Sequence, residues 1–542
     1  MDKYIIMKKL SISICLTFIA GLSMVAQTNF QEQRVKDSVQ YDKFGKLLYT
    51  VVSQYVDEVD SEELIEDAIV GMLKQLDPHS VYIPEKELKR MNEPLEGNFE
   101  GIGIQFNILN DTLIVVSPIS GGPSERLGIM SGDKMIFVED ENIAGTGLKN
   151  SDVQKLLRGK KGTIVNVKIK RSSEKELIPF AIKRDKIPIF SIDASYMADP
   201  TTGYIKVNRF ARTTMKEFAQ AIDTLKINGA KNLILDLRGN GGGYLNTAFR
   251  LADQFLDASK LIVYTQGDKQ RRQEYNATRI GSFEKGRLVV LIDEGSASAS
   301  EIVSGAVQDW DRGMVIGRRS FGKGLVQKPF PLPDGSAIRL TTARYYTPTG
   351  RSIQRPYDEG KDKYYKELTR RYESGELMER DSINFPDSLT FYTPNGRKVY
   401  GGGGIMPDIF VPLDTTLNSE LNRNLIRRGV YNEFVLNYLN KNRKEMKASY
   451  PSFSSFKNDF RLDDELLDKF FSFAKKKKVK ESEADYLKSK KLIDTQLTAL
   501  FARNLYSVSA YFEIINELND SYLEALKVLK GDAFEQAKLN FE

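Results

Sequence analysis

Residues 287–307 read RLVVLIDEGSASASEIVSGAV, an apolar run followed by small residues and then a helix-like pattern. The apolar run predicts a buried strand, and the segment from Ser298 onward predicts a helix. A serine at the first turn of a helix is exposed, and the backbone N–H groups and helix dipole there favour negative charge. An oxyanion formed by attack of such a serine would be stabilised in place.

The same stretch has a simpler interpretation, because serine at a helix start is commonly an N-cap. The segment is also crowded with serines, and spacing alone does not choose among them: Ser296, Ser298, Ser300 and Ser304.

Around this segment, residues 186–412 alternate strand-like and helix-like patterns. Residues 203–210 (GYIKVNRF) and 232–239 (NLILDLRG) predict strands, and 215–225 predicts a helix between them. The second strand opens into a glycine-rich loop, residues 239–243. This alternation predicts an α/β core over residues 186–412.

Residues 96–185 differ in character, with clustered glycines and several short strand-like runs. The entry Gly101-Ile102-Gly103-Ile104 is followed by a short helix and a Gly-Asp turn between Ser124 and Asp133. This order resembles a PDZ domain. Successive backbone N–H groups can hold an anion there. A peptide's terminal carboxylate would bind at Gly101, Ile102, Gly103 and Ile104 while its backbone adds as a strand.

The N-terminal residues are predicted to be a removed signal peptide followed by helices, and the C-terminal region is predicted to be helical. Lys8 and Lys9 precede an apolar stretch and small residues, which predicts a signal peptide over residues 1–26, with cleavage after Ala26 or Ser23. Residues 27–95 predict an N-terminal helical region, and 413–542 predict a helical C-terminal domain. The Lys475–Lys478 run is typical of a solvated face. The protein is therefore expected to be exported and periplasmic, with inner-membrane association if the signal is retained.

The residue counts exclude several chemistries. The chain has one histidine, His79, and one cysteine, Cys15, which lies in the predicted signal peptide. Zinc sites draw on several Cys and His ligands, so no metal site is expected. A Ser–His–Asp triad could use only His79, which follows a helix end in DPHSVYIP, a place where a histidine is usually structural. A serine–lysine pair is compatible with these counts.

Lys323 in SFGKG is the lysine that could serve as base. A base lysine needs a pKa near ~7–8, reached by burial and neighbouring groups, and Phe321 and Leu325 offer an apolar setting. Gln327, four residues on, could accept a hydrogen bond from the lysine. On local sequence alone, an ordinary surface lysine is the simpler interpretation. A P-loop at residues 317–323 is disfavoured, because Gly324 replaces the required Ser or Thr and prolines follow.

The motifs together resemble the carboxyl-terminal processing peptidases, also called tail-specific proteases. The resemblance runs to about residue 412 and rests on DPHSVYIP, EGNFEGIGIQF, LDLRGNGGG, EGSASASEI, SFGKGLVQ and YYTPTGRSIQ. It implies a crotonase-like α/β peptidase core with an inserted PDZ domain, N-terminal helices and a helical C-terminal domain. By position, it implies Ser298 as nucleophile, Lys323 as general base and Gln327 as its orienting partner.

The resemblance also implies an oxyanion hole and a set of partners. The donors would be the N–H groups of Ala299 and Gly242, with Gly241 or Gly243 as alternatives to Gly242. Protein or peptide substrates would be bound by their C-termini, no cofactor is implied, and a homodimer could form through the N-terminal helices. No nucleic-acid partner is expected from a net charge of +6. The alternatives are a non-catalytic PDZ-type adaptor or chaperone, and a crotonase-type acyl-CoA enzyme, which the predicted export signal disfavours.

Overall fold

The computed structural model describes residues 38–541 except 110, 172–173, 279 and 384. The predicted signal peptide lies outside the described residues. The chain divides into two compact units, residues 1–76 and 77–542. Within the described part of the chain, no helix combines the length and apolarity needed to cross a membrane.

The first unit is helical. Residues 38–54 form a helix, and α2 (Ser61–Lys74) begins at Asp60, whose carboxylate accepts the N–H of Glu62 at 2.9 Å. Phe44, Leu47 and Val52 remain exposed on the first helix. The homodimer expected through these helices stays a prediction.

The second unit begins earlier than the sequence predicted. Residues 77–95, expected in the N-terminal helical region, include β1 (Val81–Ile83), which pairs with β18 (Ala337–Tyr346). Asp77 fastens this junction by accepting the Thr341 hydroxyl at 3.0 Å. The helix α3 (Glu85–Glu96) then ends at Gly97, which adopts a left-handed conformation.

Residues 98–188 form the domain that resembles a PDZ domain. Its first strand, β2 (Asn98–Gly101), pairs with its last strand, β9 (Asp185–Pro188). Its main sheet has the order β3-β4-β5-β7-β8, so β3 lies at an edge. The elements are β3 (Ile104–Leu109), β4 (Thr112–Pro118), α4 (Pro123–Arg126), β5 (Lys134–Val138), β6 (Glu141–Asn142), α5 (Asn150–Leu157), β7 (Ile164–Lys170) and β8 (Ile178–Lys183).

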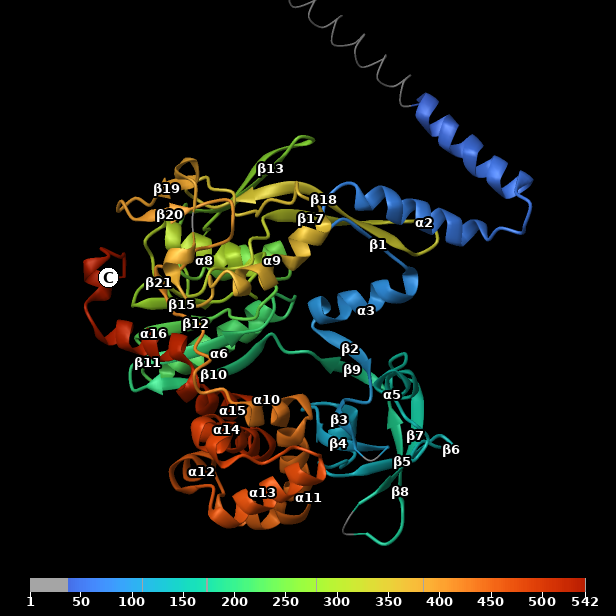
Figure 1. Ribbon diagram of the computed structural model, residues 1–542, viewed down its shortest axis with the longest axis vertical. Helices are drawn as coiled ribbons and strands as arrows, with labels where there is room; N and C mark the ends of the chain where they lie inside the picture. Colours follow the sequence, from blue (N-terminus) through green and yellow to red (C-terminus); the bar gives the residue numbers. More distant parts are fainter. Residues whose placement is uncertain (1–37, 110, 172–173, 279, 384, 542) are drawn as a thin grey trace, which may run out of the picture. The chain divides into compact units, whose positions relative to one another are not determined.

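The α/β core is built on a sheet of order β10-β11-β12-β15-β16-β21, parallel from β11 onward. Its strands are β10 (Ile192–Asp199), β11 (Thr202–Val207), β12 (Asn232–Asp236), β15 (Leu288–Ile292), β16 (Met314–Gly317) and β21 (Ile409–Phe410). One face packs on α6 (Thr214–Ile227), α7 (Leu245–Ala252) and α8 (Ala299–Asp309) in a continuous apolar cluster. The strands β12, β15 and β16 are apolar nearly throughout because both of their faces are buried. Figure 1 labels β12 and β15 within this sheet.

A second sheet has the order β1-β18-β13-β14, with β17 beside β18, and the segment that contains Lys323 leads directly into β17. Its remaining strands are β13 (Leu261–Gly267), β14 (Gln270–Asn276) and β17 (Leu325–Pro331). The following segment contains α9 (Lys361–Glu373), η1 (Arg380–Ser382), η2 (Asp387–Leu389), β19 (Thr390–Tyr392) and β20 (Lys398–Tyr400).

The C-terminal region divides into two parts rather than one domain. An aromatic-rich cluster holds together α10 (Glu420–Arg427), α11 (Val430–Ser449), α12 (Phe453–Asp459), α13 (Asp464–Lys476), α14 (Glu483–Leu505) and α15 (Val508–Ile515), here called the helical module. After η3 (Asn516–Leu518), α16 (Asp520–Lys530) and α17 (Ala533–Gln536) instead cover the second face of the core sheet, where Phe534 is fully buried. The core therefore needs the end of the chain to bury that face.

Candidate active site

Ser298 lies on the turn between β15 and α8, at the N-cap position. Its backbone has φ 56° and ψ −110°, a conformation that is costly for a residue other than glycine. The other three serines are buried and bonded to the backbone: Ser296 Oγ donates to Leu237 O, Ser300 Oγ to Asn240 O and Ser304 Oγ to Ser300 O. Of the four serines, Ser298 is the one that lines the cleft described below.

Lys323 lies on the segment between β16 and β17, and it lines the same cleft. Its Nζ donates to Gln327 Oε1 at 3.0 Å, and Gln327 Nε2 donates in turn to the carbonyl of His79 at 2.6 Å. Burial, followed by the positive charge of Arg339, lowers the pKa of Lys323 to about 8. A lysine with that pKa is partly neutral near physiological pH and can accept a proton.

The serine and lysine segments are joined by the buried carboxylate of Glu301. Glu301 Oε2 accepts the N–H of Ser298 at 2.7 Å and the N–H of Lys323 at 2.9 Å. Glu301 Oε1 accepts the N–H of Gly322 at 2.7 Å and the hydroxyl of Ser320 at 2.5 Å. Burial raises the pKa of Glu301, and these four bonds oppose that rise. One side chain therefore fixes both segments relative to each other.

A buried tyrosine provides a second link between the two segments. The Tyr345 hydroxyl donates to the Lys323 carbonyl at 2.6 Å and lies 3.1 Å from the Ser298 carbonyl. Neither Tyr345 nor Glu301 is among the site residues predicted from the sequence. Both lie in motifs that carry the family resemblance, Glu301 in EGSASASEI and Tyr345 in YYTPTGRSIQ. Glu301 had a second signal, since Ser-x-x-Glu at a helix start is a capping-box pattern.

The glycine loop after β12 lies directly against the serine. A Cβ on Gly242 would lie 2.9 Å from Ser298 Cβ and 3.0 Å from the Ala299 nitrogen, so only glycine permits this approach. However, the Gly242 N–H donates to Asn240 Oδ1 at 2.9 Å. To serve as an oxyanion donor, the Gly242 N–H would have to break its hydrogen bond to Asn240 or share it with the oxyanion. Gly241 and Gly243 also line the cleft and remain alternatives.

His79 lies beside the lysine but is not bonded to the serine. Its Nε2 is 2.8 Å from the Tyr364 hydroxyl. Burial and the charge of Lys323 lower the pKa of His79 to about 4, so its ring is neutral at pH 7. Its backbone carbonyl holds Gln327, which is a structural contribution to the site.

The cleft itself is about 450 Å³ in volume and largely apolar. Besides the residues above, it is lined by side chains from α3, α8 and β17, among them Leu88, Met91, Ile302, Leu325 and Val326. Such walls suit an apolar substrate side chain next to the reacting carbonyl. Among the described residues, no cluster of three or more His, Cys, Asp and Glu could hold a metal ion.

The predicted tail-binding residues lie at the entrance to the PDZ sheet. Gly101 ends β2, Ile104 begins β3, and Gly103 between them has φ 75°. Ser124 Oγ donates to the carbonyl of Ile102 at 2.6 Å, and the N–H of Ile119 donates to the carbonyl of Gly103 at 2.9 Å. These bonds fix the loop carbonyls away from the strand edge at which a peptide would add.

Comparison with family models divides the chain in the same order. Residues 201–359 match peptidase family S41 and residues 101–181 match a PDZ domain. Residues 15–87 match the N-terminal domain of the activating protease CtpB, and 421–507 match a family of unknown function, DUF8443.

Two curated relatives match about three fifths of the chain. The chain is 37% identical to the carboxy-terminal-processing protease of Bartonella bacilliformis over 340 residues, 62% of this chain and 77% of that one. It is 37% identical to the carboxy-terminal processing protease CtpB of Bacillus subtilis over 321 residues, 58% of this chain and 65% of that one. A solved photosystem II D1 C-terminal processing protease matches at 26% identity over 68% of this chain and 86% of that one, with a TM-score of 0.37.

The fold and these matches define a serine peptidase with a PDZ domain. The chain belongs to the carboxy-terminal processing protease family. This membership confirms the predicted family and disfavours the non-catalytic adaptor and the acyl-CoA enzyme.

Proposed function

We propose that this protease cleaves exported proteins by serine–lysine catalysis after recruiting them through their C-terminal tails. The observation that supports it best is the shared hold of Glu301 on Ser298 and Lys323, in a cleft where the pKa of the lysine is about 8. Export to the periplasm is part of the proposal and rests on the N-terminal pattern at residues 1–26.

In the proposed mechanism, neutral Lys323 takes the proton of Ser298 Oγ as that oxygen attacks the substrate carbonyl. Gln327 holds the lysine, and the N–H groups of Ala299 and Gly242 stabilise the oxyanion. Protonated Lys323 then gives its proton to the leaving amine. The C-terminal fragment departs, and the rest of the substrate remains as an ester on Ser298. Lys323 next takes a proton from water as the water oxygen attacks the ester, and it returns that proton to Ser298 Oγ as the ester bond breaks and the N-terminal fragment leaves as a carboxylic acid.

The test is cleavage of an unfolded model protein by the purified chain, with EDTA present. Ser298→Ala and Lys323→Ala should each abolish cleavage, because one removes the nucleophile and the other the base. Lys328→Ala is the matched control, since Lys328 is an exposed lysine on the same strand as Gln327 and does not line the cleft. Cleavage that persists in either active-site variant would refute the assignment.

A further inference from the structure

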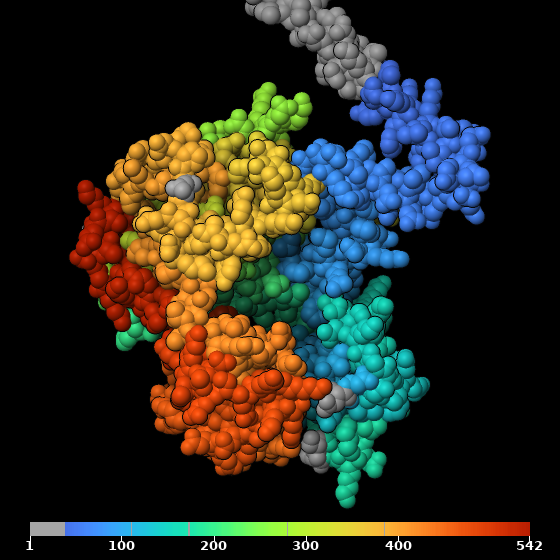
Figure 2. All heavy atoms as spheres, in the orientation of Figure 1, coloured from blue at the N-terminus to red at the C-terminus, as the bar shows by residue number. Residues whose placement is uncertain are grey.

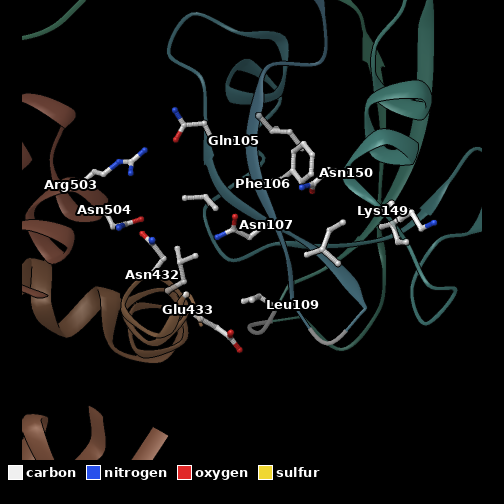
Figure 3. A pocket seen from close by; sticks show the side chains of 16 residues that line it. Gln105, Phe106, Asn107, Leu109, Lys149, Asn150, Asn432, Glu433, Arg503 and Asn504 are labelled. Carbon is white, nitrogen blue, oxygen red and sulfur yellow. The ribbon is translucent and has the colours of Figure 1, made fainter. Parts of the chain in front are cut away.

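A groove of about 940 Å³ separates the PDZ edge strand from the helical module. One wall is β3 with the start of α5, and the other is formed by α11 and the end of α14 (Figure 3). In the space-filling view, the orange surface of the helical module adjoins the blue and teal surface of the PDZ domain (Figure 2). The second wall comes from the segment that matches a family of unknown function.

Specific contacts also join the PDZ domain directly to the helical module. Arg443 Nη2 donates to Ser131 Oγ of the PDZ domain at 2.8 Å, while its Nη1 donates to the carbonyl of Asn504 at 2.8 Å. A Cβ on Gly132 would collide with the Asn440 side chain, so the turn and α11 are in close contact. The helical module is thereby held at a defined position beside β3.

The side chains of β3 point alternately to the PDZ core and to the helical module. Phe106 and Ile108 pack against the PDZ core. Because strand side chains alternate, Gln105 and Asn107 occupy the opposite face, and Figure 3 shows them on the side of Arg503, Asn432 and Asn504. A peptide that adds to β3 alternates in the same way. One set of its side chains faces the PDZ core and α5, and the other faces the helical module.

The direction of the peptide follows from its carboxylate. With the carboxylate at residues 101–104, an antiparallel tail has its last residues beside Ile104 and Gln105. Figure 3 shows Arg503 extending from α14 toward Gln105. Arg503 is exposed, and no carboxylate of the described residues forms an ion pair with it, whereas Glu433 farther along the groove pairs with Lys477 at 2.6 Å. Arg503 therefore places a positive charge, unpaired among the described residues, at the end of the groove that receives the tail's last residues.

We propose that the helical module is the second half of the tail-binding site. Its α11 and α14 read the alternate side chains that point away from the PDZ core, and Arg503 favours an acidic side chain at the penultimate position. This inference rests on the proposed recruitment of tails by the PDZ domain.

The test is fluorescence anisotropy of two labelled peptides on the full chain carrying Ser298→Ala, which prevents cleavage. Both peptides end in the same apolar residue with a free carboxylate, and they differ only in Glu or Lys at the penultimate position. The Glu peptide should bind about twofold to fivefold more tightly, the range that exposed ion pairs give. Added Arg503→Glu should reverse the order, and salt should diminish both preferences.

Lys491→Glu is the matched control, because Lys491 is exposed on the same helix and does not line the groove. It should leave the Glu-to-Lys preference unchanged. If the Arg503→Glu chain keeps the original preference, the helical module does not read the tail and the inference is wrong, while PDZ recruitment stands. If the chain binds neither peptide, tail recruitment itself is refuted and the inference falls with it.

Discussion

The rate of cleavage should rise with pH through one ionisation near pH 8. The reason is that the reaction needs the neutral amine of Lys323, whose pKa burial and the charge of Arg339 lower to about 8. Near pH 7 about one lysine in ten would then be neutral, and near pH 9 about nine in ten. The value of kcat/KM should therefore increase about tenfold between those two pH values and then reach a plateau.

The alternative pKa values give different curves. A lysine with its ordinary pKa of ~10.4 would give a rise of nearly a hundredfold over the same interval, with no plateau below pH 10. A histidine base would give a midpoint near ~6.5. The pKa of His79 is lowered to about 4, so this histidine would give no transition between pH 6 and pH 10.

The assay is kcat/KM on a fluorogenic peptide with a free C-terminus, measured from pH 6 to pH 10 at constant ionic strength. Arg339→Gln should move the midpoint upward, because it removes the positive charge that disfavours protonated Lys323. Circular dichroism at each pH separates loss of activity from unfolding. A flat profile, or a midpoint near 6.5, would refute the role given to Lys323.

The same pKa has a consequence for stability. Because the pKa of Lys323 is lower in the folded chain than in the unfolded chain, the unfolded chain holds the extra proton between about pH 8 and ~10.4. The contribution of Lys323 to the free energy of unfolding therefore rises with pH across that window. Below pH 8 both states are protonated and this contribution no longer changes.

Three further substitutions test the supports of the site and of the helical module. Gln327→Ala should lower kcat about tenfold to a hundredfold with little change in KM, because Lys323 loses the acceptor that aims it. Glu301→Gln should lower the free energy of unfolding by about 3–6 kcal/mol in urea titrations, because an amide keeps about two of the four bonds to a buried charge. Phe470→Ala should cost about 3–5 kcal/mol in the same titration, since Phe470 is fully buried in the helical module.

The two stability substitutions, Glu301→Gln and Phe470→Ala, each have a comparison that isolates the cause. Glu513→Gln removes a partly exposed carboxylate that pairs with the exposed Lys457, and it should change stability by less than about 1 kcal/mol. Phe471→Ala removes a partly buried ring beside Phe470 and should cost less than Phe470→Ala. Equal losses within either pair would contradict the burial argument, and a Gln327→Ala effect confined to KM would contradict its orienting role.

Much of the fold follows from local patterns in the chain. The strands at 232–236 and 288–292 are buried on both faces and are apolar except for Asn232 and Asp236 at the two ends of the first, which made them readable from sequence. The family motifs also placed Ser298 and Lys323 by position, and the single histidine restricted the chemistry.

Other features depend on contacts between distant segments. Without the family motifs, Ser298 can be distinguished from its three neighbouring serines only in the folded chain. There the other three hydroxyls are buried and donate to the carbonyls of Leu237, Asn240 and Ser300. The Gly242 N–H is directed at Asn240, a detail that spacing does not reveal. The hub at Glu301 joins residues up to 22 positions apart, which no local period encodes.

The sequence by itself determined the order of the domains, the family and the residue types available for catalysis, because these depend on short-range patterns and on which side chains exist. Only the tertiary structure decided how the helical C-terminal region is used. Its last helices bury the second face of the core sheet, while α11 and α14 form a wall beside the PDZ edge strand. Helical periodicity shows that a helix has an apolar face, but the partner of that face is set by packing across the whole chain.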